Sequence, residues 1–234
     1  VCQHTPDENE MREKYLEVIN REPQKRITRY AAGIMGGTGF AVFFGCNLRD
    51  AVIAFIVSVM IVAVGDWLAK RESNLLVYNG ILAFISEVII IGALKMGIAE
   101  HPDRIMIGIV MLLISGLSTT NGIRDLLQRD FISGFINIMN SFLGAAGIAF
   151  GIGLAIILFH EGYSDHFILN HSVPIQLLSC TVACTGFALW FKIRGKQVWY
   201  NSIGAFFTWA IYVAVYAVKP SNFMATMIAA GFVG

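Results

Sequence analysis

Thr38-Gly39-Phe40-Ala41-Val42-Phe43-Phe44 returns later in this chain as Thr185-Gly186-Phe187-Ala188-Leu189-Trp190-Phe191, with five of the seven positions identical. Each copy lies in a long apolar run and precedes a short polar loop. The second copy comes five apolar runs after the first, so the chain would enter a membrane there from the opposite side. Inverted repeats are typical of secondary transporters, whose halves surround a central site. Thr38 and Thr185 are therefore candidate site residues. The alternative is a chance match in a chain rich in Gly, Ala and Phe.

The composition around this repeat predicts a membrane protein. The 234 residues are 56% hydrophobic and 14% charged, with a mean hydropathy of +0.65, whereas soluble domains carry about 25% charged residues. Most apolar runs approach the ~20 residues that a helix needs to cross the hydrocarbon core. They fall at 30–45, 51–68, 75–98, 104–120, 131–159, 173–191 and 198–218, with another from 221. We expect an all-α polytopic helical bundle, with about seven full transmembrane helices and a truncated eighth.

The positive charges predict the orientation, because cytoplasmic loops carry an excess of Lys and Arg. With the N-terminus in the cytoplasm, 13 of the 17 Lys and Arg lie inside and Arg49, Lys95, Arg104 and Lys219 lie outside. We therefore expect a multi-pass protein of the cytoplasmic membrane, in contact with the lipid bilayer and without a nucleic-acid partner.

Four segments are expected along the chain. Residues 1–29 form the tail of a cytoplasmic N-terminal region, and 30–159 the first transmembrane half, with five helices. Residues 160–172 form an external loop, and 173–234 the start of a second half that is C-terminally incomplete. Both ends look cut, because Val1 replaces an initiator Met and Gly234 ends an apolar run after about fourteen residues.

Polar residues inside a membrane are costly, so each is a functional hypothesis. Glu87 lies at the centre of the third expected span, beside Ser86, where a carboxyl suits a proton carrier. The alternative is a protonated or paired structural glutamate. Asn79 lies one to two turns nearer the cytoplasm. Asn137 and Asn140, at i and i+3 on the fifth span, either hydrogen-bond between helices or line a substrate path.

The densest polar cluster near the bilayer joins the fourth and fifth spans. Asp130 is expected to cap the fifth helix, with Ser133 in its first turn. Arg124 and Asp125, close to Asn121, are adjacent opposite charges that could receive the carboxylate and ammonium groups of an amino acid. The alternative is a membrane anchor in which the arginines fix the topology and nothing binds.

Other features carry less chemistry. Cys180 and Cys184, one turn apart, are expected to pack, and we expect no metal and no cofactor. Three loop histidines could form a metal or pH-sensing site with Glu161 and Asp165, but loop histidines are usually solvated; they are His160, His166 and His171. Two small-xxx-small glycine pairs are expected to let helix backbones approach closely; they are Gly33 with Gly37, and Gly147 with Gly151.

At the fourth and fifth spans the chain resembles the threonine/serine exporter family (ThrE, including the two-component YjjP/YjjB type). The resemblance rests on residues 121–126, Asp130, residues 133–134 and residues 148–151. Residues 36–45 with Asp50-Ala51 resemble its first span, and residues 185–188, 194–196 and 221–223 the start of its second half. The resemblance implies about ten helices in two halves, fused or as separate subunits, and export of small amino acids using the membrane potential or the proton gradient.

Two departures from the family pattern stand out. Asn137 and Asn140 replace an expected arginine and acid, which puts the inherited substrate chemistry in doubt. Leu112 and Ser115 replace prolines of the fourth helix, so a break in that helix is not expected.

The favoured function is therefore a secondary exporter of threonine or serine, driven by the proton-motive force, with a second membrane subunit or a homo-oligomer as partner. The alternative is a dicarboxylate such as succinate on the same scaffold. A membrane enzyme is not expected, because the sequence has no zinc-protease motif and no Ser/His/Asp set on one side of the bilayer. A purely structural membrane protein would not need Glu87 at mid-membrane.

Overall fold

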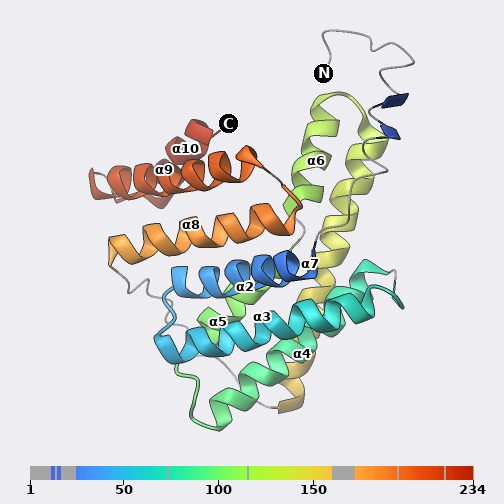
Figure 1. Ribbon diagram of the computed structural model, residues 1–234, viewed down its shortest axis with the longest axis vertical. Coiled ribbons are helices and arrows are strands. Elements are labelled where there is room, and N and C mark those ends of the chain that lie inside the picture. The colour runs from blue at the N-terminus through green and yellow to red at the C-terminus, as the bar shows by residue number, and fades with distance from the viewer. Residues whose placement is uncertain are drawn as a thin grey trace.

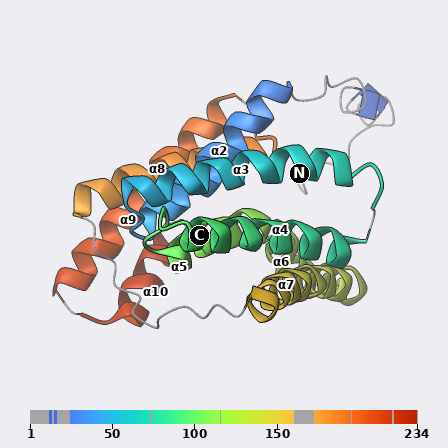
Figure 2. The same cartoon turned by 90° about the horizontal axis from the view of Figure 1, so that it is seen from below.

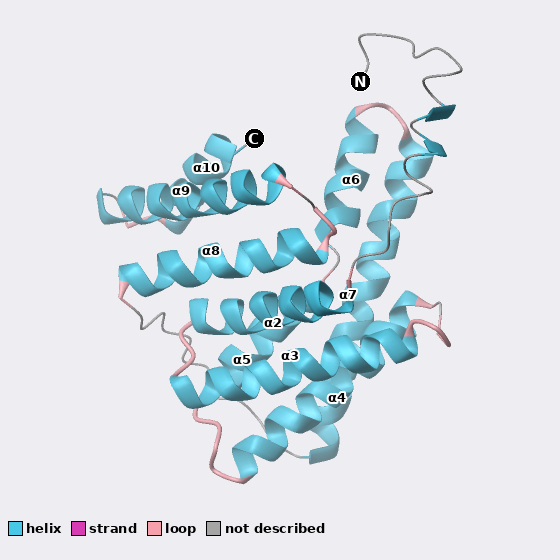
Figure 3. Ribbon diagram, viewed as in Figure 1, coloured by secondary structure: helices cyan, strands magenta, loops and turns pink. Residues whose placement is uncertain are grey.

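The structure is a computed structural model that describes residues 12–13, 15–16, 25–72, 74–114, 116–159, 172–193, 195–218 and 220–233. Within these residues the chain is helical and has no strand (Figure 3), which confirms the predicted all-α class. The helices are α2 (Arg26–Phe43), α3 (Leu48–Leu68), α4 (Leu75–Lys95), α5 (Pro102–Leu113), α6 (Gly116–Leu127), α7 (Phe131–Phe159), α8 (Val173–Trp190), α9 (Lys196–Val218) and α10 (Asn222–Val233).

Five of the described helices are long and apolar enough to cross a membrane, namely α3, α4, α7, α8 and α9. α5 and α6 pass the same test together as one bent span, which would make six. α2 carries Arg26 and Arg29 in its first turn, and α10 has 12 residues. The chain is thus a multi-pass membrane protein, but the expected seven complete spans and truncated eighth are not confirmed.

The sequence repeat extends to whole helices. The shift along the chain that carries Thr38 onto Thr185 also carries the first residue of α2 onto the first residue of α8, and the last residue of α2 onto the last residue of α8. The same shift carries the first residue of α4 onto the first residue of α10. The repeat is therefore a property of the helix order and not only of a short stretch of sequence.

The end of α8 copies the end of α2. Three backbone hydrogen bonds close each helix: Phe44 N to Phe40 O, Gly45 N to Val42 O and Cys46 N to Ala41 O after α2, and Phe191 N to Phe187 O, Lys192 N to Leu189 O and Ile193 N to Ala188 O after α8. Each donor and each acceptor in the second set is the repeat equivalent of a donor or acceptor in the first set. Gly45 (φ 100°) and Lys192 (φ 62°) are the left-handed residues that such a helix end requires. Lys192 thus adopts a conformation that glycine adopts more easily.

α2 and α8 lie side by side and run antiparallel (Figure 1). The backbone of Gly33 lies near Trp190, and that of Gly39 lies near Ala183. Residue numbers therefore fall along α8 as they rise along α2, which is the relative direction that the predicted inverted repeat requires. Along this antiparallel pair Thr38 lies at the same height as Thr185. The two copies of the repeat therefore meet at their first residues.

α4 and α7 form the second closely packed pair. A Cβ on Gly147 or on Gly151 would meet a carbonyl oxygen of α4. In the same way, a Cβ on Gly33 or on Gly37 would meet a side chain of α3. The predicted role of both glycine pairs in close helix packing is therefore confirmed.

The fourth expected span is broken, so the prediction of an unbroken helix there is wrong. α5 ends at Leu113, α6 begins at Gly116, and the two helices are bent by 51°. The cause is packing, not proline. α5 lies on α2, where a Cβ on Gly108 would come within 2.6 Å of Ala41 N, whereas α6 lies on α7, where a Cβ on Gly122 would come within 2.9 Å of the Gly134 carbonyl. Two different partners therefore hold the two parts in two directions.

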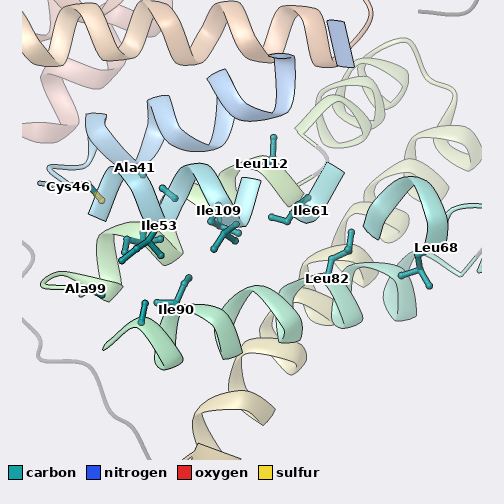
Figure 4. Close-up of a cluster of buried hydrophobic side chains, with 14 residues drawn as sticks. Ala41, Cys46, Ile53, Ile61, Leu68, Leu82, Ile90, Ala99, Ile109 and Leu112 are labelled. Atoms are coloured by element: carbon teal, nitrogen blue, oxygen red, sulfur yellow. The ribbon is translucent and has the colours of Figure 1, made fainter. Parts of the chain in front are cut away.

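The hydrophobic core joins these helix pairs. It contains Ile53 and Ile61 from α3, Leu82 and Ile90 from α4, and Ile109 and Leu112 from α5 (Figure 4). Figure 2 shows α4, α6 and α7 grouped on the side of the molecule away from α8. α5 lies between, in contact with α2, α3 and α4.

Candidate functional site

Glu87 lies within α4 and is 1% exposed. It lines a cavity of about 10 Å³ between α4, α5 and α7, close to the smallest volume that holds one water. Ser86 is the other polar residue of the lining, and its Oγ donates to Leu82 O over 2.7 Å. An ionisable residue buried within a helix of membrane-spanning length is a functional-site hypothesis by default.

Asn79 lies two turns before Glu87 on α4 and is 3% exposed. Its Nδ2 donates to the Gly144 carbonyl of α7 over 3.3 Å. Asn79 therefore forms a hydrogen bond between α4 and α7.

A ladder of polar contacts joins α6 to α7. Asp125 Oδ2 accepts from Asn137 Nδ2 over 2.9 Å and from Ser133 Oγ over 3.2 Å. Two turns away, Thr119 Oγ1 lies 2.7 Å from Ser141 Oγ. Ser133, Asn137 and Ser141 are spaced by four residues, so they form one polar face of α7, and this face lies against α6.

The turn between α6 and α7 contains the predicted helix cap. Asp130 Oδ1 accepts from Ser133 N over 3.2 Å, which confirms Asp130 as the N-cap of α7. Arg129, just before it, has a positive φ of 67°.

Arg124 and Asp125, the pair that the sequence offers as a receptor, have different surroundings in this structure. Adjacent residues of a helix point to different faces, and the Asp125 carboxylate faces α7. Arg124, Asn121 and Asn140 are exposed. The structure therefore separates the groups that the sequence placed together.

The polar residues on α4 and α6 meet α7 at different levels. Asp125 contacts Asn137, whereas Glu87 shares its cavity with Ile152. These two residues of α7 are fifteen positions apart, which corresponds to about 22 Å of helix. Glu87 and Asp125 consequently belong to two sites.

The two threonines of the repeat have different surroundings. The Thr38 hydroxyl is buried and has no hydrogen-bond partner among the described residues. Thr38 lines a groove of about 430 Å³ between α2 and α8, whose other walls are mainly apolar. Thr185 Oγ1, in contrast, donates to Thr181 O over 2.7 Å and lies 2.7 Å from Ser202 Oγ of α9. The two equivalent threonines thus differ in their side-chain contacts.

Two family models of threonine/serine exporters match the chain. The first, ThrE, covers residues 1–159, and the second, described as "Threonine/Serine exporter, ThrE", covers residues 176–234. The chain belongs to the threonine/serine exporter family. It is similar to the threonine/serine exporter of Corynebacterium glutamicum, with 25% identity over 156 residues. That match covers 64% of this chain and 32% of the relative, so the chain spans about a third of that protein's length. No solved structure matches.

This member of the exporter family also contains a buried polar cluster that our reading of the sequence did not single out as a site. Asp50, 0% exposed on α3, accepts from Glu100 N over 2.9 Å and from His101 N over 3.3 Å. Its Oδ2 also lies 3.0 Å from His101 Nδ1. One carboxylate therefore holds the loop between α4 and α5 against the start of α3. In the sequence, the signals available were an acid in the first turn of a helix, Asp50, and a histidine directly before Pro102, His101.

Neighbouring residues extend the Asp50 cluster to α2. Arg104, 6% exposed at the start of α5, donates from Nη1 to the Gly45 carbonyl over 2.5 Å. Burial raises the pKa of the Cys46 thiol, and the nearby Asp50 carboxylate raises it further. The thiol is therefore neutral, and the cluster ties the ends of α2, α3 and α5 together at one end of the bundle.

At the opposite end of α2 and α3, Arg29 Nη1 lies 2.5 Å from Asp66 Oδ1. This ion pair is half-exposed. Three histidines of the expected external loop, His160, His166 and His171, lie outside the described residues. Within the part of the chain that is described, no group of three or more His, Cys, Asp or Glu side chains could hold a metal ion.

Proposed function

We propose that this chain exports threonine or serine across the cytoplasmic membrane, driven by the proton-motive force. Membership of the threonine/serine exporter family is the observation that carries the proposal. The inverted pair of α2 and α8 supports it, because many secondary transporters are built from inverted halves.

In this proposal Glu87 carries the proton. Glu87 is a buried ionisable residue within a helix of membrane-spanning length, and intramembrane carboxyl groups serve as proton relays in transporters. Thr38 and Thr185 lie where the halves cross, while Asp125, Asn137 and Asn79 hold α4 and α6 to α7. Arg124, Asn121, Asp130 and Asn140 stay candidates for contact with the substrate.

The proposed topology has the N-terminus in the cytoplasm. Residues 1–29 are then the tail of a cytoplasmic region, 30–159 the first transmembrane half and 160–172 an external loop. Residues 173–234 begin the second half. The active unit pairs these halves with a further membrane subunit or a second copy.

Efflux from cells that express the full-length protein tests the proposal. Cells are preloaded with labelled threonine, serine and succinate, and efflux is followed with and without a protonophore. Faster loss of threonine or serine than in control cells, abolished by the protonophore, is expected. Loss of succinate alone would move the substrate class to dicarboxylates, and loss of none of the three would contradict the proposed function.

A further inference from the structure

The described helices form two closely packed groups. α2 packs extensively on α8 and also on α3 and α5, whereas α4 and α6 both pack extensively on α7. Contacts between the two groups, of α4 with α3 and of α4 with α5, are less extensive. The seam between α4 and α5 is therefore less closely packed than the α2–α8 and α4–α7 pairs that lie to either side of it.

Glu87 lies in this seam. Its cavity is lined from α4 by Ala83, Ser86, Glu87 and Ile90, and from α5 by Met106, Ile109, Val110 and Leu113. Ile152 of α7 completes the lining. Among the described residues that line the cavity, α5 and α7 contribute no titratable or charged side chain, and the titratable group is Glu87.

The break between α5 and α6 lies at the edge of the same cavity. Leu113 is both a cavity residue and the last residue of α5. On one side of the break, Gly108 holds α5 to α2, and on the other Gly122 holds α6 to α7. The chain thus passes from one packed group of helices to the other at this point.

We propose that α4 and α5 separate at this seam, and that water in the widened cavity carries the proton to and from Glu87. The Glu87 carboxyl gives its proton to a water molecule, which leaves as hydronium, and the carboxylate later takes a proton from hydronium that enters from the other side. The present cavity corresponds to the closed state, because its volume is at the limit for one water. This inference rests on the proposed role of Glu87 in proton coupling and adds the route and the moving part.

Filling the cavity tests the route. Val110→Phe places a larger apolar side chain in the seam, and Val52→Phe makes the same change on α3 at a position that is 55% exposed. Full-length protein in proteoliposomes is assayed in two modes, net efflux driven by a pH gradient and exchange of labelled for unlabelled threonine at equal pH. Exchange moves solute in both directions and needs no net proton release.

For Val110→Phe we expect net efflux to fall about tenfold relative to Val52→Phe, the effect of roughly 1.4 kcal/mol on a barrier, while exchange persists. Loss of both modes, or of neither, overturns the inference. A wild-type protein without either mode would instead contradict the proposed function itself.

A second variant keeps the test decisive if Val110→Phe does not reach the membrane. Ser86→Cys is introduced after the native cysteines have been replaced, and its labelling by a small hydrophilic thiol reagent is measured. Ser86 lines the seam and is 2% exposed, so labelling is expected to rise during net efflux and to stay low without a gradient. Equal labelling under both conditions overturns the inference.

Discussion

Gly186 of α8 lies against Gly36 of α2 so closely that a Cβ on Gly186 would come within 2.5 Å of the Gly36 nitrogen. The contact is with backbone, which cannot move aside without shifting a helix. Gly186→Leu is therefore expected to force the repeat helices apart and to destabilise the protein by roughly 1–3 kcal/mol, the usual cost of overpacking.

The melting temperature of purified protein in detergent measures this effect. Gly204→Leu is the matched control, because a Cβ on Gly204 has nothing within 4 Å. Equal melting temperatures for the two variants would mean that α2 and α8 are not packed through these glycines.

Most helices could be located from the sequence, because apolar runs mark the segments that can cross a membrane. The predicted run 131–159 has the bounds of α7, and 173–191 differs from α8 by one residue. The break after Leu113 could not be predicted in this way. It results from packing of α5 on α2 and of α6 on α7, partners that no local pattern identifies.

Candidate site residues could be predicted where a polar side chain stands in an apolar run, because such a residue is costly in a membrane. Glu87 and Asn79 are polar residues in apolar runs, and both are buried. Asp50 and His101 were missed as a pair because each looks ordinary in its own segment, and their contact joins residues 51 positions apart. The pairing of Arg124 with Asp125 was suggested by adjacency in sequence, which on a helix places two side chains on different faces.

Asp50 is expected to contribute to stability through the donors that it accepts. Asp50→Ala would leave the part-buried Glu100 N and His101 N without their acceptor, at about 0.5–1.5 kcal/mol for each hydrogen bond lost. Asp50→Asn keeps one acceptor oxygen and should cost less. We expect the melting temperature to fall in the order wild type, Asp50→Asn, Asp50→Ala.

The control for Asp50 is Asp66→Ala, which removes a carboxylate whose side chain is 27% exposed and which pairs with Arg29. Half-exposed ion pairs contribute about 0–1 kcal/mol, so this variant should melt close to wild type. A larger loss for Asp66→Ala than for Asp50→Ala would show that the Asp50 cluster does not hold the helix ends together.

The contact of Asp125 with Asn137 predicts non-additive variants. Asp125→Ala removes the acceptor of Asn137 Nδ2 and Ser133 Oγ, so each single variant is expected to be destabilised. The double variant with Asn137→Ala should be less destabilised than the sum, by a coupling of about 0.5–3 kcal/mol. Melting of the four proteins of this cycle gives the value, and strict additivity would mean that α6 does not dock through this pair.

Glu87→Gln is expected to separate transport from the proton gradient. Glutamine has nearly the same shape and can fill the same buried position, but it cannot give up a proton. If Glu87 binds and releases a proton in each cycle, wild-type efflux should rise as the external pH is lowered below the internal pH, because protons then enter as solute leaves. The variant should show slow efflux with no dependence on that gradient.

Glu100→Gln makes the same change on a half-exposed side chain at the end of the bundle and should keep the wild-type response. Efflux measured at several external pH values, at fixed internal pH, distinguishes the two variants. A Glu87→Gln protein with the wild-type pH response would leave Glu87 with a structural role in the packing of α4 against α5 and α7.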